Sequence, residues 1–234
     1  MPALRAVFLD AGNTLVGLDY EVITERVRAD GHHHLTVSDV RTAEQRARAR
    51  LDPHLAAARS TETPDTFRLY LRYTLDGLGI PWDPAAERLA DDLRAAKPPY
   101  GLWSTLVPEA PAVLDRLRRR GLRLAVVSNS NGTVGDILRM VGLAGYLDAI
   151  MDSGLVGVEK PHPKIFETAA AAVGVRTDEA VHVGDLYSVD VVGARAAGCR
   201  AILLDPAGVW WDADCPTAPD LHGAAALIEG MLGG

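Results

Sequence analysis

Five short apolar runs recur along the sequence, and each one ends in polar residues or glycine. They cover residues 6–9, 122–127, 149–151, 180–183 and 201–204. Continuous apolar runs, in place of alternating ones, predict strands covered on both faces, as in a parallel sheet between two layers of helices. The segments between them predict helices at residues 108–120, 134–141, 163–173 and 189–197. This alternation predicts a doubly wound, Rossmann-like α/β fold with right-handed crossovers.

One interval, from about residue 19 to residue 97, breaks the alternation. It contains no strand-like run but several helix-start signals. A capping box begins at Thr36, and Thr63 and Asp83 each precede a proline at the first helical position. We interpret the interval as an inserted four-helix domain. The expected division is a Rossmann-like core from residues 1–17 and 102–234 and a helical cap from residues 18–101, with hinges near Gly17 and within residues 97–101.

The composition argues against several classes of partner. The chain has 24 basic and 31 acidic residues, a net charge of −7, so it lacks the cationic surface that nucleic-acid binding requires. No apolar stretch approaches the roughly 18 residues of a membrane span, and the segment before Asp10 is too short for a signal-peptide core. The two cysteines, Cys199 and Cys215, cannot form a disulfide framework. We therefore expect a soluble cytoplasmic protein with neither a nucleic-acid nor a membrane partner.

Polar residues follow three of the predicted strands. Asp10 closes the first run, Ser128 and Asn129 follow the second, and Asp185 follows the fourth. The carboxyl ends of the strands form the ligand crevice of an open α/β sheet, so these residues should converge there. A carboxylate at the end of a buried strand, followed at once by a glycine turn, indicates that Asp10 is a nucleophile or a metal ligand.

In order, these segments resemble the haloacid dehalogenase-like hydrolase superfamily, and the resemblance covers nearly the whole chain. It rests on residues 10–14 (Asp-Ala-Gly-Asn-Thr), Ser128-Asn129, Lys160-Pro161, and Gly184-Asp185 with Asp190 five residues after Asp185. The helical insertion directly after the first segment is similar to the helical cap of the subfamily IA type.

The resemblance implies a Mg²⁺-dependent phosphatase that acts on a small phosphorylated metabolite. Asp10 would attack phosphorus and form a phosphoaspartate, which splits one difficult displacement into two easier steps. Asp10, Asp185 and the backbone carbonyl of Gly12 would bind Mg²⁺, which prefers one or two carboxylates together with water and substrate oxygens.

The resemblance also implies roles for the other matched residues. The Ser128 hydroxyl and the Asn129 amide groups would hold phosphoryl oxygens, and the Lys160 ammonium would offset the charge that develops there. Ser128 and Lys160 are therefore expected to be catalytic together with the nucleophile. Thr14 and Asp190 would lie behind this first layer, with Asp190 orienting Lys160 or a metal-bound water. Lys160 stands out because arginine supplies nearly every other basic residue.

Gly12 departs from the pattern of the family's phosphatases, which have an aspartate at this place. That aspartate protonates the leaving group and then activates water, and general acid–base catalysis of this kind is worth roughly 10²- to 10⁴-fold. Four explanations stay open. The substrate has a good leaving group, as in an acyl or aryl phosphate; a cap residue, for example from residues 32–34, supplies the proton; the enzyme performs another of the family's reactions; or the protein binds a ligand without turnover.

Two family variants also lack this aspartate. Phosphonatase-type hydrolases need a cap lysine, and the only lysine of the cap region, Lys97, stands beside two prolines. Dehalogenase-type hydrolases work without metal, whereas this chain keeps Asp185 and Asp190. Both therefore rank below a Mg²⁺-dependent phosphatase. A non-catalytic or weakly active protein that binds a phosphate ligand is the alternative from another class.

Three further features have less specific interpretations. We expect His182, within an apolar run, to be a core histidine with satisfied hydrogen bonds. The triplet at residues 32–34 is expected in a loop between cap helices, because adjacent side chains point in different directions and rarely bind one metal. Trp210 and Trp211 are expected to pack on the core surface or to form an interface, in a protein that is a monomer or a homodimer.

Overall fold

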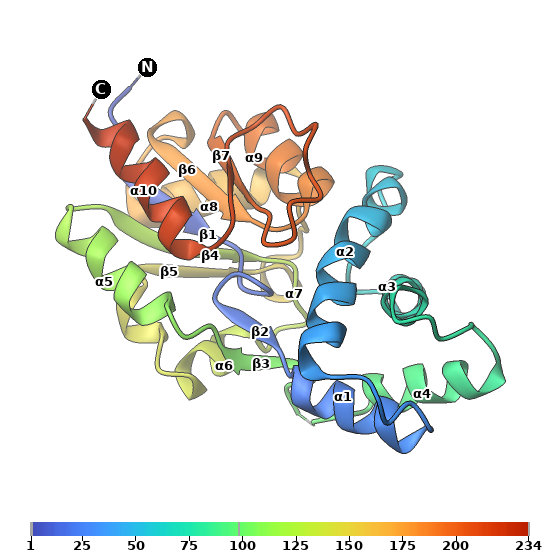
Figure 1. Ribbon diagram of the computed structural model, residues 1–234. Helices are drawn as coiled ribbons and strands as arrows, with labels where there is room; N and C mark the ends of the chain where they lie inside the picture. The colour runs from blue at the N-terminus through green and yellow to red at the C-terminus, as the bar shows by residue number, and fades with distance from the viewer. Residues whose placement is uncertain (1, 98, 234) are drawn as a thin grey trace. The chain divides into compact units, whose positions relative to one another are not determined.

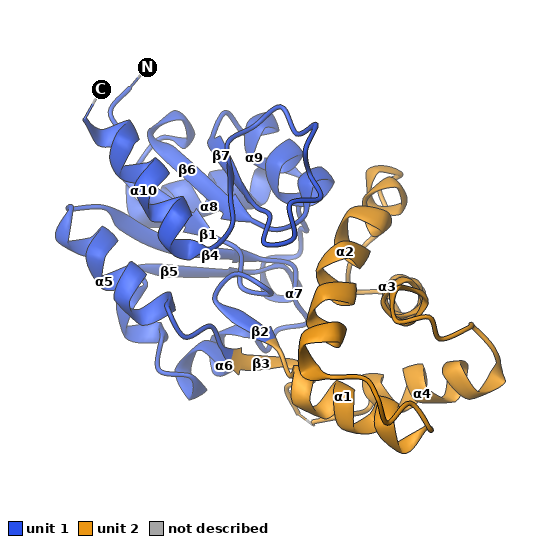
Figure 2. Cartoon of the chain, viewed as in Figure 1, with its two compact units in different colours: residues 1–17, 106–234 blue, residues 18–105 orange. Residues whose placement is uncertain are grey.

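The computed structural model describes residues 2–97 and 99–233. The chain divides into two compact units, unit 1 from residues 1–17 and 106–234 and unit 2 from residues 18–105 (Figure 2). The expected second hinge includes Pro98, which lies outside the described residues. The second boundary between the units falls a few residues later, between Thr105 and Leu106.

Unit 1 is built around a six-stranded parallel sheet with the strand order β5-β4-β1-β6-β7-β8 (Figure 1). Its strands are β1 (Ala6–Leu9), β4 (Arg123–Ser128), β5 (Ala149–Asp152), β6 (Ala180–Gly184), β7 (Arg200–Leu204) and β8 (Thr217–Ala218). The first five match the predicted strands to within one residue at either end. The chain order reverses across β1, so the sheet is doubly wound, and the predicted Rossmann-like α/β fold is confirmed.

Helices cover both faces of this sheet. They are α5 (Ala110–Arg119), α6 (Val134–Met140), α7 (Ser153–Val156), α8 (Pro163–Val173), α9 (Val192–Ala196) and α10 (Leu221–Leu232). Helices α5 and α10 lie on one face and α8 on the other, as Figure 1 shows. Phe8 of β1 and Phe166 of α8 are fully buried in one apolar cluster, which joins α8 to the sheet. Short 3₁₀ turns occupy Ala144–Tyr146 and Thr177–Glu179.

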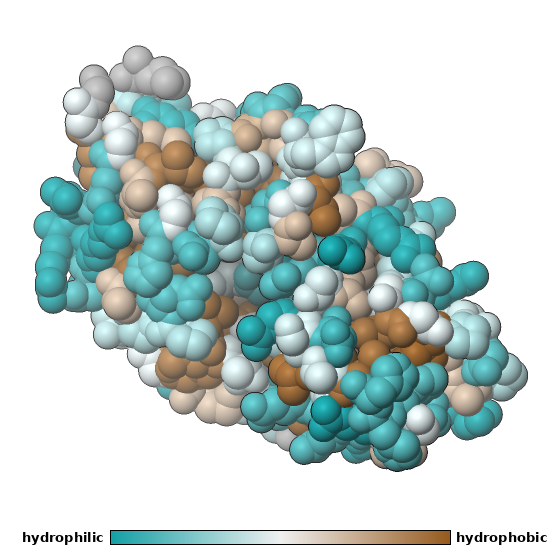
Figure 3. Space-filling view, in the orientation of Figure 1, coloured by the Kyte–Doolittle hydropathy of each residue, from teal (hydrophilic) through white to brown (hydrophobic). Residues whose placement is uncertain are grey.

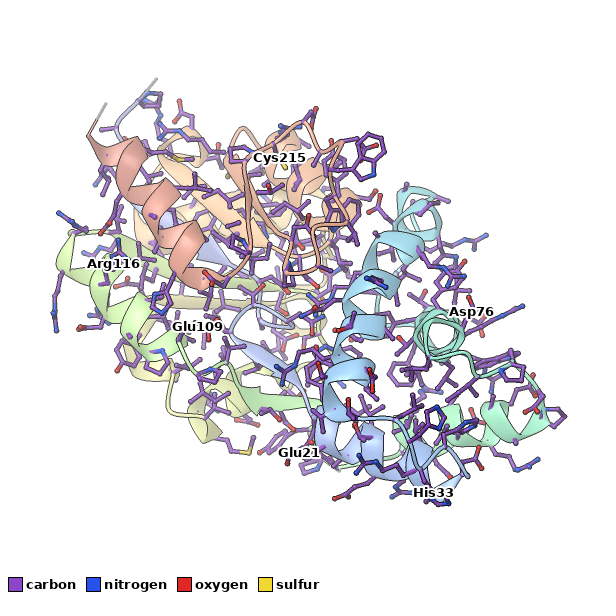
Figure 4. All side chains as sticks on the ribbon, in the orientation of Figure 1. Glu21, His33, Asp76, Glu109, Arg116 and Cys215 are labelled. Atoms are coloured by element: carbon purple, nitrogen blue, oxygen red, sulfur yellow. The ribbon has the colours of Figure 1, made fainter. Side chains whose placement is uncertain are left out.

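The basic run at the end of α5 pairs with an acidic side chain of α10. The guanidinium groups of Arg116 (Figure 4) and Arg120 donate to Oε1 of Glu229 at 2.9 and 3.0 Å. These hydrogen bonds lower the pKa of Glu229 to about 2, and the bond from Arg116 has the largest effect. These basic residues lie at the C-terminal end of α5, where cations complement the helix dipole. Figure 3 shows hydrophilic residues interspersed with apolar ones on the visible face.

The described residues of unit 2 form four helices, α1 (Tyr20–Ala29), α2 (Val37–Ala56), α3 (Pro64–Gly77) and α4 (Pro84–Arg94). The side chains of Asp19, Thr36, Thr63 and Asp83 cap their N-termini by accepting backbone N–H groups. The predicted capping box at Thr36 and the predicted caps at Thr63 and Asp83 are confirmed. Among the described residues, no helix has both the length and the apolar character that crossing a membrane demands.

Besides the two-residue strand β8, two short strands escaped prediction. They are β2 (Val16–Leu18) and β3 (Trp103–Leu106), which pair in a two-stranded sheet. Each boundary between the units falls inside one of these strands. Their three and four residues are too few to show a strand period in the sequence.

A buried ion pair organises the interior of unit 2. Arg48 donates from Nε and Nη2 to the two carboxylate oxygens of Glu44, each at 2.7 Å, and both residues are buried. The hydroxyl of Tyr20 donates to Oε2 of Glu44 at 2.6 Å, and the hydroxyl of Tyr70 donates to Oε1. Burial alone would raise the pKa of Glu44, but Arg48 outweighs it and lowers that pKa. Helices α1, α2 and α3 thus meet at one fully bonded carboxylate.

We expect Glu44→Gln to destabilise the protein by about 3–5 kcal/mol, because the variant leaves the Arg48 cation buried without its counter-charge. Urea unfolding at pH 7 measures the loss. Asp76→Asn is the matched control, because Asp76 (Figure 4) pairs with Arg50 on the surface of α3. Such an exposed pair is worth below about 1 kcal/mol. Equal losses in the two variants would contradict the structural role of Glu44.

The same ion pair predicts a pH dependence. The folded-state pKa of Glu44 lies below its ordinary value, so its stabilisation is complete above the unfolded-state pKa of about 4.3. The stabilisation is lost as the pH falls through the lowered folded-state pKa. The difference between the wild-type protein and Glu44→Gln should therefore shrink in this acidic range.

Candidate active site

Three polar residues converge because their strands are neighbours. Strand β1 lies between β4 and β6, with Leu9 in register with Val126 on one side and with Val183 on the other. Asp10 therefore leaves β1 beside Ser128, at the end of β4, and Asp185, directly after β6. The parallel orientation brings all three to the carboxyl edge of the sheet, as the sequence predicts.

Lys160 joins two carboxylates at this edge. Its Nζ donates to Oδ1 of Asp10 at 2.6 Å and to Oδ1 of Asp190 at 2.7 Å. The Lys160 side chain is only 2% exposed. Burial alone would lower the pKa of Lys160, but the charges of Asp10 and then of Asp190 outweigh it and raise that pKa above its ordinary value. The lysine is therefore a permanent cation held between two carboxylates.

Asp190 is held by four donors. Its Oδ1 accepts from Lys160 and lies 2.9 Å from Nε2 of His182, and its Oδ2 accepts the N–H groups of Asp185 and Leu186 at 3.1 and 2.9 Å. Burial opposes ionisation, but Lys160 and His182 outweigh it and hold the pKa of Asp190 well below its usual range. Because protein donors occupy both oxygens, the geometry suits Asp190 to orienting Lys160.

The chain around Asp190 differs from the predicted helix at residues 189–197. A π-helical turn, Tyr187–Val191, precedes the short helix α9. This turn brings the Asp190 carboxylate over Gly184, so closely that a Cβ on residue 184 would overlap the Cγ of Asp190. Only glycine fits at this position. Single-turn π-helical segments of this kind are frequent at functional sites.

Asn129 has a different contact from the one expected. Its side chain binds the backbone of Lys160: Oδ1 accepts the N–H at 2.7 Å, and Nδ2 donates to the carbonyl at 3.0 Å. These two bonds tie the Asn129 carboxamide to the Lys160 backbone, and its role in holding phosphoryl oxygens stays a prediction. Ser128 is buried and donates from its hydroxyl to the Asn129 carbonyl at 3.2 Å.

Asp152 and Ser153 shape the loop after β4, a function that sequence reasoning missed. The Asp152 carboxylate accepts the N–H groups of Gly132 and Val134 at 3.0 and 3.2 Å, and Ser153 Oγ accepts that of Ser130 at 3.0 Å. Asp152 also caps α7. These bonds fix the backbone that follows Ser128. The sequence signal was the acidic residue at the end of the third apolar run.

The acidic residues could hold a metal ion. Asp10, Asp185 and Asp190 each place one carboxylate oxygen within 4.8 Å of the others, and all three are buried. Burial and the charge of Asp190 raise the pKa of Asp10 against the effect of Lys160, so a further cation would stabilise its ionised form. Because Asp190 is already bonded, Asp10 and Asp185 are the donors that suit a hard cation such as Mg²⁺.

Asn13, next to Gly12, contributes a contact that the sequence analysis did not assign. Its Nδ2 donates to Oδ2 of Asp185 at 3.1 Å. The backbone of Asn13 is left-handed, with φ at 54°, a conformation that asparagine tolerates better than most residues. Thr14, predicted to support the site, is buried with no hydrogen-bond partner for Oγ1 among the described residues.

The remaining candidates can be placed within their own units. His33 and His34 are exposed in the loop between α1 and α2, where Figure 4 labels His33. Nζ of Lys97 donates to Asp19 at 2.6 Å, so the lysine that a phosphonatase would need is held in an ion pair. Trp210 stacks on Tyr187, with ring centroids 5.9 Å apart, whereas Trp211 is 88% exposed.

The doubly wound parallel sheet and the acidic cluster at its carboxyl edge define a Rossmann-like α/β protein. A family profile of haloacid dehalogenase-like hydrolases matches residues 4–198, so the chain belongs to this family. The family resemblance seen in the sequence is thereby confirmed.

Similar proteins include hydrolases and phosphatases. Haloacid dehalogenase-like hydrolase domain-containing protein 3 of Mus musculus is 31% identical over 211 residues, covering 86% of this chain and 82% of the mouse protein. The phosphoserine phosphatase of Thermus thermophilus is 45% identical over 104 residues, covering 43% of this chain and 41% of the phosphatase. A putative HAD hydrolase of Bacillus subtilis, solved bound to magnesium, has the same fold, with a TM-score of 0.60, 17% identity and coverage of 97% of this chain and 100% of that one.

We expect Gly184→Ala to lower activity sharply and to destabilise the fold by about 1–3 kcal/mol, because the new methyl group overlaps Asp190. Hydrolysis of an aryl phosphate and thermal unfolding measure the two effects. Gly230→Ala is the matched control: Gly230 lies in α10, where a Cβ would meet nothing within 4 Å. That change should stabilise by up to about 1 kcal/mol. Full activity in Gly184→Ala would refute the packing argument.

Proposed function

We propose that the protein is a Mg²⁺-dependent phosphomonoesterase that acts through a phosphoaspartate on Asp10. The observation that carries the proposal is the buried contact of Lys160 with Asp10, beside Asp185. A nucleophilic carboxylate that attacks a phosphate needs positive charge near it, because two anions must approach each other. The named phosphatases among the similar proteins support a phosphate ester of a small metabolite as the substrate.

The proposed reaction has two displacements. Asp10 attacks phosphorus through Oδ2, since Lys160 holds Oδ1, and the bond from phosphorus to the leaving-group oxygen breaks. Water then attacks the phosphoaspartate, inorganic phosphate leaves, and the carboxylate is restored. In both steps the Lys160 ammonium and the Ser128 hydroxyl offset charge on the transferring group.

The donor set fits a divalent cation. Asp10, Asp185 and the Gly12 carbonyl would hold it, and Mg²⁺ bound there would neutralise charge on the phosphoryl oxygens. The protein's own contribution is to keep these groups in place: Asn13 bonds to Asp185, and Lys160 bonds to Asp10.

Asp10→Asn should abolish phosphate release, by a factor on the order of 10³ or more, because the amide is a poor nucleophile. The assay measures phosphate released from an aryl phosphate and from an acyl phosphate, with Mg²⁺ and with excess chelator. Single-turnover trapping followed by mass analysis should locate one phosphoryl group on Asp10 of the wild-type protein. Activity unchanged in excess chelator would refute the metal assignment.

The same assays separate the alternatives. A non-catalytic phosphate binder would show ligand-induced thermal stabilisation without phosphate release, and its binding would be indifferent to Asp10→Asn. A dehalogenase would release halide from a 2-haloacid and would not respond to chelator. Either result would replace the phosphatase proposal.

Gly12→Asp should raise the turnover of alkyl phosphates on the order of 10²-fold, the lower part of the range for an added general acid. The gain should be small for aryl phosphates, whose leaving groups depart without a proton. Gly12→Asn is the matched control, because it adds a side chain of nearly the same size that cannot supply the proton. Equal effects of Asp and Asn would show that proton transfer is not limiting.

A further inference from the structure

His182 is a buried residue whose polar contacts exceed what packing requires. It is fully buried in β6, with its ring edge-on to Phe166 of α8 at a centroid distance of 5.0 Å. Its Nε2 lies 2.9 Å from Oδ1 of Asp190, while its Nδ1 is buried with no hydrogen-bond partner among the described residues. The expectation of a satisfied core histidine was therefore wrong for Nδ1. An apolar ring would pack against Phe166 without the cost of an unbonded polar atom. Packing alone therefore does not explain a histidine here, and the contact at Nε2 is the feature that distinguishes it.

The tautomer of this ring follows from its neighbours. Both oxygens of Asp190 already act as acceptors, Oδ1 for Lys160 and Oδ2 for two backbone N–H groups, so the carboxylate offers Nε2 an acceptor. Nδ1 is buried with no acceptor among the described residues, so a proton there would be left unbonded and the ring carries a single proton. That proton must be on Nε2, because Nε2 is the atom that faces Asp190. His182 is thus a hydrogen-bond donor aimed at Oδ1.

The oxygen that His182 contacts is also the oxygen that holds Lys160. Oδ1 of Asp190 lies 2.7 Å from Nζ of Lys160, and the same Nζ lies 2.6 Å from Oδ1 of Asp10. The Lys160 ammonium is therefore shared between two acceptors. A hydrogen bond from His182 to Asp190 offsets part of the charge of Asp190. Asp190 then attracts the Lys160 ammonium less strongly, and the ammonium stays closer to Asp10.

We propose that His182 is a positioning residue for the reaction, which places the Lys160 ammonium beside Asp10 by donating from Nε2 to Asp190. His182 acts through Asp190 and Lys160 and does not itself touch the substrate. The inference rests on the proposed function only in that Asp10 is taken as the nucleophile. Without the Nε2 donor, Lys160 would move toward Asp190 and the charge beside Asp10 would weaken.

A matched pair of substitutions separates positioning from packing. His182→Gln keeps an N–H donor on a flexible side chain, whereas His182→Met has similar length and volume but no donor. We expect kcat for an aryl phosphate to fall roughly 10- to 100-fold in His182→Met, the usual range for residues that orient a catalytic group from behind. His182→Gln should recover most of this loss, and KM should change little in either variant. Equal losses in both variants would overturn the proposal and assign His182 to packing.

Nitrogen NMR tests the proposal without using activity. The chain has only three lysines, Lys97, Lys160 and Lys164, so Lys160→Arg identifies the Lys160 ammonium signal in ¹⁵N-lysine-labelled protein. This signal should shift in His182→Met and stay near its wild-type position in His182→Gln. An unchanged signal in His182→Met would contradict the proposal even if the protein proved not to be a phosphatase.

One measurement needs no variant at all. In ¹⁵N-histidine-labelled wild-type protein, the His182 ring should show a protonated Nε2 and an unprotonated Nδ1. The opposite tautomer, or a doubly protonated ring, would overturn the assignment of the donor. This result stands if His182→Met fails to fold. Failure of phosphate release in the wild-type protein, by contrast, would count against the proposed function alone.

Discussion

The contact of one buried ammonium with two carboxylates is the interaction on which the rest of the site depends. Without Lys160, Asp10 and Asp190 would be two buried anions with no cation between them, and one would take up a proton. Without the carboxylates, a buried lysine would lose its proton instead. The charge of each group is stabilised by the opposite charge beside it. Because Asp10 and Lys160 lie 150 residues apart in sequence, the site acquires its charges only when the sheet is assembled.

The fold could be predicted because it is written in local patterns. Apolar runs bounded by glycine and polar residues indicate buried parallel strands, and capping residues such as Thr36 mark helix starts. Both kinds of element can therefore be predicted without knowing which residues they contact in the fold. Two kinds of element could not be found this way. Strands β2 and β3 are too short to show a period, and the turn at Tyr187–Val191 depends on how Asp190 meets Gly184 across the structure.

The same distinction applies to the site. Residues proposed to bear the chemistry, such as Asp10, Lys160 and Asp185, stand in recognisable segments of the sequence. Residues that hold them do not, because their partners are distant or belong to the backbone. Asn13 meets Asp185 from 172 positions away, and Asp152 bonds to N–H groups that any sequence would provide. His182 left one usable signal: an imidazole inside a strand buried on both faces must find a partner.

Every side chain from His182 through Asp190 and Lys160 to Asp10 comes from unit 1, and the backbone around Gly184 fixes the carboxylate at its centre. No side chain between residues 18 and 105 therefore belongs to this charged network. The charged groups and the helical insertion thus occupy separate stretches of sequence. Within unit 1, the tight turn over Gly184 leaves no space for a larger residue at that position.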